Sequence, residues 1–156
     1  MPDNRTLYEQ VILDHNKRPR NYGRLPDADR VIDGHNPLCG DSFKVYLKFD
    51  GDCIAEARFD GHGCAISKSS ASLMTTLAAG KTREEAKALG RMFREMLASD
   101  PNTPLDEEQL GKLMVFAGVR AFPMRIKCAV LPWHALMAGL ENDEDQVGKV
   151  LSVSTE

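Results

Sequence analysis

Three cysteines and one aspartate stand in short motifs whose residue types suit a metal or sulfur site. The motifs are Asn36-Pro37-Leu38-Cys39-Gly40-Asp41, Gly61-His62-Gly63-Cys64 and Arg125-Ile126-Lys127-Cys128. Each thiol falls where the chain is expected to turn or to change element, and from such a place a side chain can project from a rigid scaffold. The motifs therefore predict one site assembled from distant parts of the chain.

Each of the three thiols has its own local chemistry. Cys39 lies between a proline and a glycine, in a turn with a stiff entry and a permissive exit, so we expect it to be the mobile, reactive thiol. Cys64 follows two glycines and opens a predicted helix, whose N–H groups and dipole favour a metal-binding thiolate. Cys128 follows Arg125 and Lys127, whose positive charges favour ionisation or serve a partner surface.

Asp41 is the candidate fourth donor. Zinc in a closed site takes four donors in a tetrahedron, and thiolates and carboxylates are within its range. Three thiolates and one carboxylate around Zn²⁺ leave a charge of about −2, which nearby cations or N–H groups must offset. Arg125, Lys127 and backbone amides are candidates for that task. Such a ligand set could release one sulfur to chemistry while the metal stays bound.

Simpler roles exist for each of these residues. Asp41 could cap or turn its loop as aspartates commonly do. Cys64 and Cys128 could be small buried residues. Cys53 lacks a turn motif and shares a predicted strand face with apolar residues, so we assign it to the core. Four histidines compete as metal ligands, because imidazole is a common one.

The histidines differ in their distance from the cysteine motifs along the chain. His35 is close to the first motif and is the best reserve ligand, whereas His62 is expected to point away from Cys64. His15 and His134 fall on predicted helices and are expected to be surface residues or to have hydrogen-bond partners of their own.

Length and composition limit the class of protein. The chain has 156 residues, 42% hydrophobic and 28% charged, which suits one soluble domain with a sizeable core. The formal charge of −3 and the lack of a basic run argue against nucleic acid as a partner. No apolar stretch reaches the roughly 20 residues of a membrane span, and the first residues do not form a signal peptide. We expect a cytoplasmic protein with reduced thiols.

Periodicity predicts an α+β domain over residues 1–140. A helix begins at Asp3 or Asn4 and ends before Pro19, and residues 30–35, 43–49 and 53–60 form a three-stranded antiparallel sheet. Helices follow, and we expect them to pack on one face of the sheet. Residues 141–156 are predicted to be a polar, frayed tail.

The predicted helices after the sheet span residues 64–80, then a segment opened by the Thr82 capping box, then a segment opened by Asp106. Proline is favoured only in the first turn of a helix, so Pro123 and Pro132 predict two helices within 119–140. Cys128 would then lie at their junction.

In combination the motifs resemble the U-type iron–sulfur cluster assembly proteins, the family of NifU N-terminal domains and IscU, and within it the SufU subgroup. The resemblance covers nearly the whole chain apart from the tail. The matching stretches are Leu7-Tyr8, Asp14-His15, Pro19-Arg20-Asn21, the motif ending at Asp41, Gly61 to Ser67 with Ser69-Ser70, Lys127-Cys128-Ala129 and Leu131-Pro132-Trp133.

The resemblance implies a compact α+β scaffold of the SufE/NifU type that binds zinc through Cys39, Asp41, Cys64 and Cys128. It implies that Cys39 accepts a persulfide sulfur from a SufS-like, PLP-dependent cysteine desulfurase, and that a desulfurase histidine replaces Cys39 on zinc. Arg125 is implied as a contact for this partner. The sulfur would pass to a downstream iron–sulfur scaffold, so the chain would be a sulfurtransferase only together with its desulfurase.

Some residues differ from the pattern of the broader family, and these differences bear on whether the chain passes sulfur on as a relay or builds clusters as a scaffold. Lys127 stands where cluster-building members carry a histidine, and residues 122–125 match their Leu-Pro-Pro-Val-Lys chaperone-recognition stretch poorly, whereas residues 97–118 are similar to the extra segment of SufU. The leading hypothesis is therefore a zinc-dependent sulfur relay. The alternatives are a scaffold that holds a transient [2Fe-2S] cluster on the same cysteines and a zinc site that only stabilises the fold.

Overall fold

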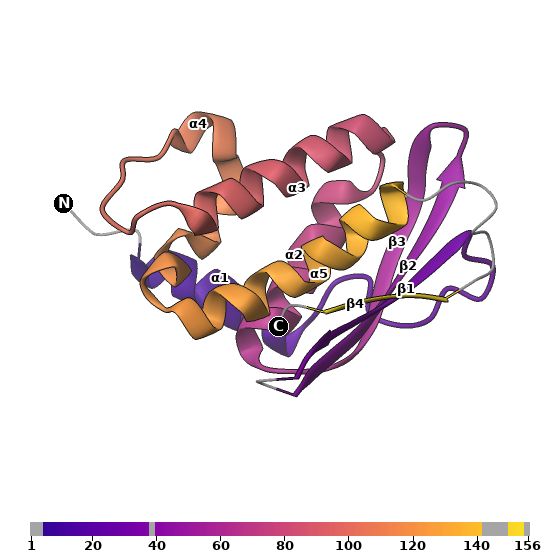
Figure 1. Cartoon of the computed structure of the whole chain (residues 1–156), viewed down its shortest axis with the longest axis horizontal. Helices are drawn as coiled ribbons and strands as arrows, with labels where there is room; N and C mark the ends of the chain where they lie inside the picture. Colours follow the sequence, from indigo (N-terminus) through magenta and orange to yellow (C-terminus); the bar gives the residue numbers. More distant parts are fainter. Residues whose placement is uncertain (1–4, 38–39, 142–149, 155–156) are drawn as a thin grey trace.

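The computed structural model describes residues 5–37, 40–141 and 150–154. Its order of elements is the predicted one: a helix, then strands, then helices (Figure 1). Within the described residues, no helix is both long and apolar enough to cross a lipid bilayer. The elements are α1 (Arg5–Lys17), β1 (Arg30–Asn36), β2 (Asp41–Asp50), β3 (Cys53–His62), α2 (Ala65–Ala78), α3 (Arg83–Ala98), α4 (Glu107–Leu110), η1 (Gly111–Ala121), α5 (Pro123–Glu141) and β4 (Val150–Ser154).

The sheet has the strand order β3-β2-β1-β4. The predicted meander is confirmed: β1 pairs antiparallel with β2, and β2 pairs antiparallel with β3. Asn36, the last residue of β1, lies opposite Asp41, the first residue of β2, and Ser42 lies opposite His62 at the end of β3. The first two cysteine motifs therefore meet at one end of the sheet.

The helices pack on one face of the sheet, with α2 and α5 against the strands and α3 against α5 (Figure 1). Inward-facing residues of the strands alternate with outward-facing ones and meet apolar residues of these helices in one main core. Gly139 sets the approach of α5, because a Cβ there would lie 2.6 Å from Ile32 Cδ1. The core residues fully or almost fully removed from solvent include Ile32, Val45, Leu47, Met74, Phe93, Phe116, Trp133 and Leu136.

The prediction of two helices within residues 119–140 is wrong. α5 is one helix with Pro132 inside it. Proline has no N–H to donate to the carbonyl of Cys128, and an interior proline costs about 3 kcal/mol or more. Burying a large apolar side chain contributes about 1.5–3 kcal/mol, and Trp133, Leu136 and Leu140 are all at most 2% exposed. The burial of this helix face outweighs the energetic cost of the interior proline. Cys128 therefore lies in the second turn of a continuous helix.

Two other segments differ from their predictions. The segment that Asp106 opens is a single α-helical turn, α4, followed by the 3₁₀ helix η1. The expectation of a frayed tail is wrong for Val150–Ser154, which forms β4 and pairs parallel with β1 from Val31 to His35. The alternation of apolar and polar residues in this segment suits a strand, and the free edge of β1 supplies the hydrogen-bonding partner.

Cys53 is exposed, so its assignment to the core is wrong. The register between β2 and β3 shifts near Lys48 and Phe49, leaving Ala55 as an extra residue on β3. Such a bulge exchanges the two faces of the strand on one side of it. Ile54 is consequently buried and Cys53 is not, whereas Ala57 and Phe59 beyond the bulge face the core as predicted.

Candidate metal centre

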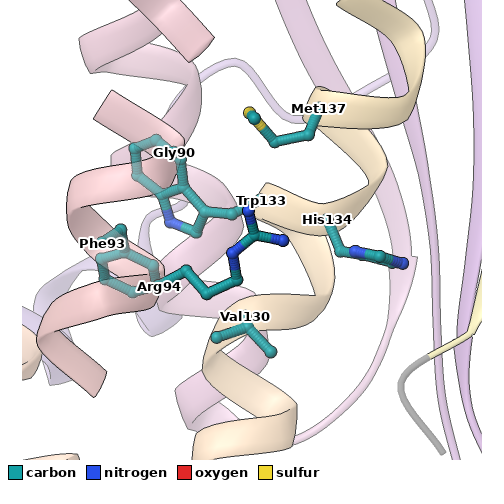
Figure 2. A pocket seen from close by; sticks show the side chains of 7 residues that line it. All are labelled: Gly90, Phe93, Arg94, Val130, Trp133, His134 and Met137. Carbon is teal, nitrogen blue, oxygen red and sulfur yellow. The ribbon is translucent and has the colours of Figure 1, made fainter. Parts of the chain in front are cut away.

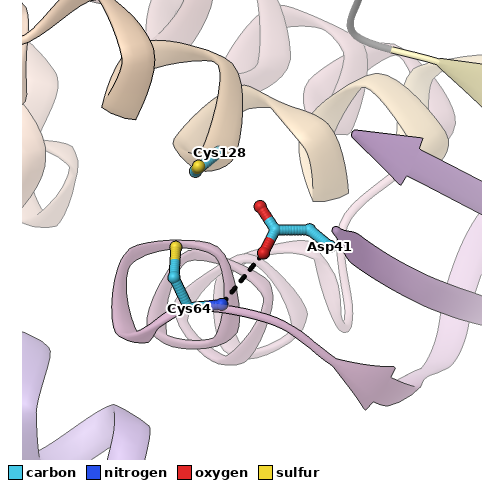
Figure 3. Close-up of side chains that lie close together, drawn as sticks. All are labelled: Asp41, Cys64 and Cys128. Atoms are coloured by element: carbon cyan, nitrogen blue, oxygen red, sulfur yellow. Dashed lines mark hydrogen bonds between the residues drawn. The ribbon is translucent and has the colours of Figure 1, made fainter. Parts of the chain in front are cut away.

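Three elements bring Asp41, Cys64 and Cys128 together. Asp41 begins β2, Cys64 caps the N-terminus of α2, and Cys128 lies on α5. One donor atom from each lies within 4.8 Å of the other two, and Figure 3 shows the side chains converging. Among the described residues this is the only group of three or more histidine, cysteine or acidic donors so close together.

The Asp41 carboxylate is buried, with 2% of the residue exposed. Oδ1 accepts a hydrogen bond from the backbone N–H of Cys64 at 2.9 Å (Figure 3). Oδ2 is buried and has no hydrogen-bond partner among the described residues. A buried acceptor left unpaired costs about 1–3 kcal/mol, and more when it is charged. The simpler interpretation expected Asp41 to cap or turn its own loop, but its observed bond joins β2 to Cys64, 23 positions away. The other carboxylate oxygen stays available for a cation.

The Cys64 sulfur sits at the start of α2 as predicted. The backbone N–H of Ser67 donates to it at 3.5 Å, and the Ser67 hydroxyl lies at the same distance. Cys64 is only partly buried. Amide donors and the positive end of the helix dipole stabilise negative charge on this sulfur.

The Cys128 sulfur is buried between α5 and the end of β1. Asn36 Nδ2 donates to Cys128 Sγ at 3.6 Å, and the Cys128 thiol donates to the Met124 carbonyl at 3.6 Å. No role was predicted for Asn36, although it begins the first cysteine motif. Its contact with Cys128 joins residues 92 positions apart in the chain, and no local sequence pattern predicts a contact between residues so far apart.

Gly63 leaves the space in which the Asp41 carboxylate lies. A Cβ at Gly63 would come within 2.6 Å of Asp41 Oδ1 and of Ser67 Oγ, and within 2.7 Å of Phe43 Cε2. Two sulfurs and a free carboxylate oxygen, held at this spacing on rigid elements, match the donors that zinc accepts. The described residues thus fit a metal ion and offer it three donor atoms.

The remaining predicted site residues lie around this centre. Cys39 is outside the described residues, but the ends of its loop are tied together, because the Gly40 N–H donates to the Asn36 carbonyl at 2.9 Å. Arg125 is exposed in the first turn of α5, and Lys127 is partly buried one residue before Cys128.

The histidines stay outside the donor group. His35, the reserve ligand, is exposed, and its Nε2 lies 3.5 Å from Asp33 Oδ2. His62 and His134 are also exposed. His15 has a partner, as predicted, because its Nδ1 lies 2.7 Å from the Ser72 hydroxyl.

His15 helps to hold α1 and the following loop against α2, the helix that carries Cys64. The Ser72 hydroxyl also accepts a hydrogen bond from the Arg20 backbone N–H at 2.8 Å, so it joins His15 of α1 and the loop at Arg20 to α2. Burial, together with the positive charge of Arg20, lowers the pKa of His15 below its ordinary value of 6.5.

A separate small cavity lies between α3 and α5 (Figure 2). Its volume of about 50 Å³ has room for a few water molecules but not for a cofactor. No predicted metal ligand is part of its wall. The residues that line it are Gly90, Phe93, Arg94, Val130, Trp133, His134 and Met137.

Comparisons with known proteins agree with this arrangement. The family described as "NifU-like N terminal domain" matches residues 7–129. The chain is 45% identical to the zinc-dependent sulfurtransferase SufU of Bacillus subtilis, over 89% of this chain and 92% of that protein. It is 42% identical to the iron–sulfur cluster assembly scaffold protein IscU of Streptococcus pyogenes, over 86% of this chain and 83% of that one. A solved structure described as an iron–sulfur cluster assembly scaffold for the SUF system of Fervidobacterium islandicum superposes with a TM-score of 0.79 at 36% identity, covering 89% of this chain and all of that one.

Proposed function

The chain belongs to the family of NifU-like N-terminal domains, together with the SufU and IscU proteins of iron–sulfur cluster assembly, and from this premise we propose that it is a zinc-dependent sulfur relay. In this proposal Cys39, Asp41, Cys64 and Cys128 bind Zn²⁺, and Cys39 accepts persulfide sulfur from a cysteine desulfurase. The similarity to a zinc-dependent sulfurtransferase supports the proposal.

The observation that carries the proposal is the buried Asp41 Oδ2, which finds no hydrogen-bond partner in the described part of the chain and shares one small space with two cysteine sulfurs. Bound zinc would hold the sulfurs as thiolates and balance the carboxylate charge. Asp41 stands two residues after Cys39 in the sequence, so the fourth ligand can come from the loop between Asn36 and Gly40.

The transfer step involves three sulfur atoms: the Cys39 thiolate, the terminal sulfur of the desulfurase persulfide and the sulfur of the desulfurase cysteine. The Cys39 thiolate attacks the terminal sulfur of the desulfurase persulfide, and the sulfur–sulfur bond of that persulfide breaks as a new one forms on Cys39. The electron pair of the broken bond leaves on the desulfurase cysteine, so no external oxidant or reductant is needed. The persulfide on Cys39 then passes to an iron–sulfur scaffold.

Arg125 is the proposed contact for the desulfurase. It is exposed in the same helix as Cys128 and one turn before it. A cation at this place can meet a carboxylate of the partner and orient the two proteins as they associate. Phe122 and Met124 beside it are 58% and 54% exposed, and add apolar surface to the same end of α5.

A scaffold for a transient [2Fe-2S] cluster is the second candidate. It is favoured by the similarity to IscU of Streptococcus pyogenes, which is named as an assembly scaffold, and by thiolates that suit iron as well as zinc. Lys127, in the place before the third cysteine, favours the relay over this candidate.

Desulfurase turnover measured with zinc-loaded protein tests the proposal. Wild-type protein and Cys53→Ser, a matched change at an exposed thiol outside the site, should stimulate turnover, whereas Cys39→Ser should not. Stimulation by Cys39→Ser at the wild-type level would refute Cys39 as acceptor. Iron and inorganic sulfide in anaerobically purified protein, with visible absorption, would favour the scaffold. No stimulation by any of the three would leave zinc a structural role only.

A further inference from the structure

Asn36 occupies an unusual place beside the metal centre. Its side chain is fully buried at the end of β1, directly opposite Asp41 on β2. Its backbone carbonyl accepts the Gly40 N–H at 2.9 Å and closes the loop that contains Cys39. Its side-chain Nδ2 donates to the sulfur of Cys128 at 3.6 Å. One residue thus contacts the base of the Cys39 loop and a second metal ligand.

The amide of Asn36 is only half satisfied. Oδ1 is buried and has no hydrogen-bond partner among the described residues. An asparagine kept only to fill space could be replaced by an apolar residue of similar size without that cost. The end of the amide that is used is the donor, and it points at sulfur.

The hydrogen bond from the Asn36 side-chain N–H to the Cys128 sulfur can persist when a metal binds. The Cys128 thiol donates its proton to the Met124 carbonyl at 3.6 Å, and that bond ends when the proton leaves on metal binding. The Asn36 N–H can continue to donate to the sulfur, because a metal-bound thiolate is a hydrogen-bond acceptor. Groups of this kind orient metal ligands and set the affinity of the site.

We infer that Asn36 is a positioning residue of the metal centre: its side-chain N–H orients and stabilises the Cys128 sulfur as a ligand, while its main chain anchors the Cys39 loop. The inference rests on the proposed function, since it assumes that these residues bind zinc.

Two variants separate the donor from its surroundings. Asn36→Leu keeps the branched shape in a larger side chain and removes the donor, and Asn36→Asp keeps the shape and size and replaces the donor with an oxygen of a charged carboxylate. Neither change removes the backbone carbonyl that holds Gly40. Asn102→Leu, in the exposed turn after α3, is the matched control for the chemical change.

Zinc affinity is measured by competition with a chromophoric chelator under reducing conditions. We expect Asn36→Leu to bind zinc about 10- to 100-fold more weakly than wild type, Asn36→Asp to bind more weakly still, and Asn102→Leu to match wild type. In the cobalt-substituted protein, loss of the N–H···S bond should move the sulfur-to-cobalt charge-transfer band to longer wavelength. A structural role alone would lower the unfolding temperature of the metal-free protein without moving this band.

Unchanged zinc affinity and an unchanged cobalt band in a folded Asn36 variant would overturn the inference. If Asn36→Leu does not fold, Asn36→Asp makes the same comparison, because it preserves the shape of the side chain. A wild-type protein that binds no zinc would instead overturn the proposed function, so the two failures are distinguishable.

Discussion

Replacing Gly63 with alanine is the sharpest test of how the carboxylate is held. Gly63 precedes Cys64 and has no side chain where Asp41, Ser67 and Phe43 meet. The new Cβ would lie 2.6 Å from Asp41 Oδ1 and Ser67 Oγ and 2.7 Å from Phe43 Cε2. These contacts come from two different elements, β2 and α2, so we expect the carboxylate to be displaced.

Two effects determine how far Gly63→Ala lowers the free energy of unfolding. Overpacking a tight site costs about 1–3 kcal/mol. Moving Asp41 also weakens the 2.9 Å hydrogen bond from the Cys64 N–H, and a hydrogen bond to a charged group contributes about 1.5–3 kcal/mol. Because the shift of Asp41 relieves part of the overpacking while it weakens the hydrogen bond, the two costs do not add in full, and we expect the free energy of unfolding to fall by about 2–4 kcal/mol. For a chain of this length that lowers the unfolding temperature by about 5–15 °C.

The assay is thermal unfolding of the metal-free, reduced protein, followed by zinc competition. Gly118→Ala is the control, because no atom lies within 4 Å of a Cβ placed there, and it should change the free energy of unfolding by no more than about 1 kcal/mol. Gly63→Ala should also bind zinc at least about 10-fold more weakly. If Gly63→Ala unfolds at the temperature of the control and keeps wild-type affinity, the proposed role of this glycine is wrong.

Three other predictions concern residues outside the metal centre. Folding lowers the pKa of His15 below its ordinary value of 6.5, so below about pH 6.5 the unfolded chain binds more protons at this residue than the folded chain does. His15 therefore costs no stability above about pH 6.5 and lowers the free energy of unfolding increasingly as the pH falls. Denaturant titrations from pH 7 to 5 should show a smaller decrease of that free energy for His15→Gln than for wild type, and equal decreases would contradict this. Cys53 is exposed and Cys128 is 2% exposed, so mass spectrometry of briefly alkylated, zinc-loaded protein should find Cys53 modified well before Cys128; equal rates would contradict the placement of Cys53. Ending the chain at Glu141 removes β4 and should speed amide exchange over residues 31–35, where it pairs with β1; unchanged exchange would show that this pairing does not protect the strand.

Local patterns were sufficient for most of the fold. Strand alternation predicts β2, and the Thr82–Glu85 capping box predicts the start of α3, where both of its hydrogen bonds are present. These signals succeed because they depend on neighbours within a few residues. Pro132 misled the prediction because its cost is local, whereas the burial that offsets it comes from residues of other elements.

For the candidate metal centre, too, local sequence was enough for some features and the folded structure was needed for others. Residue type and position were enough to name candidate metal ligands, because cysteine and aspartate at turns or at the start of a helix can donate to a metal whatever the rest of the fold. The folded chain was needed to show that Asp41, Cys64 and Cys128 share one space, that Asn36 donates to Cys128, and that Cys53 lies outside the core. The ability to donate to a metal is a property of one side chain, whereas a distance between residues far apart in the chain follows from how the whole core packs.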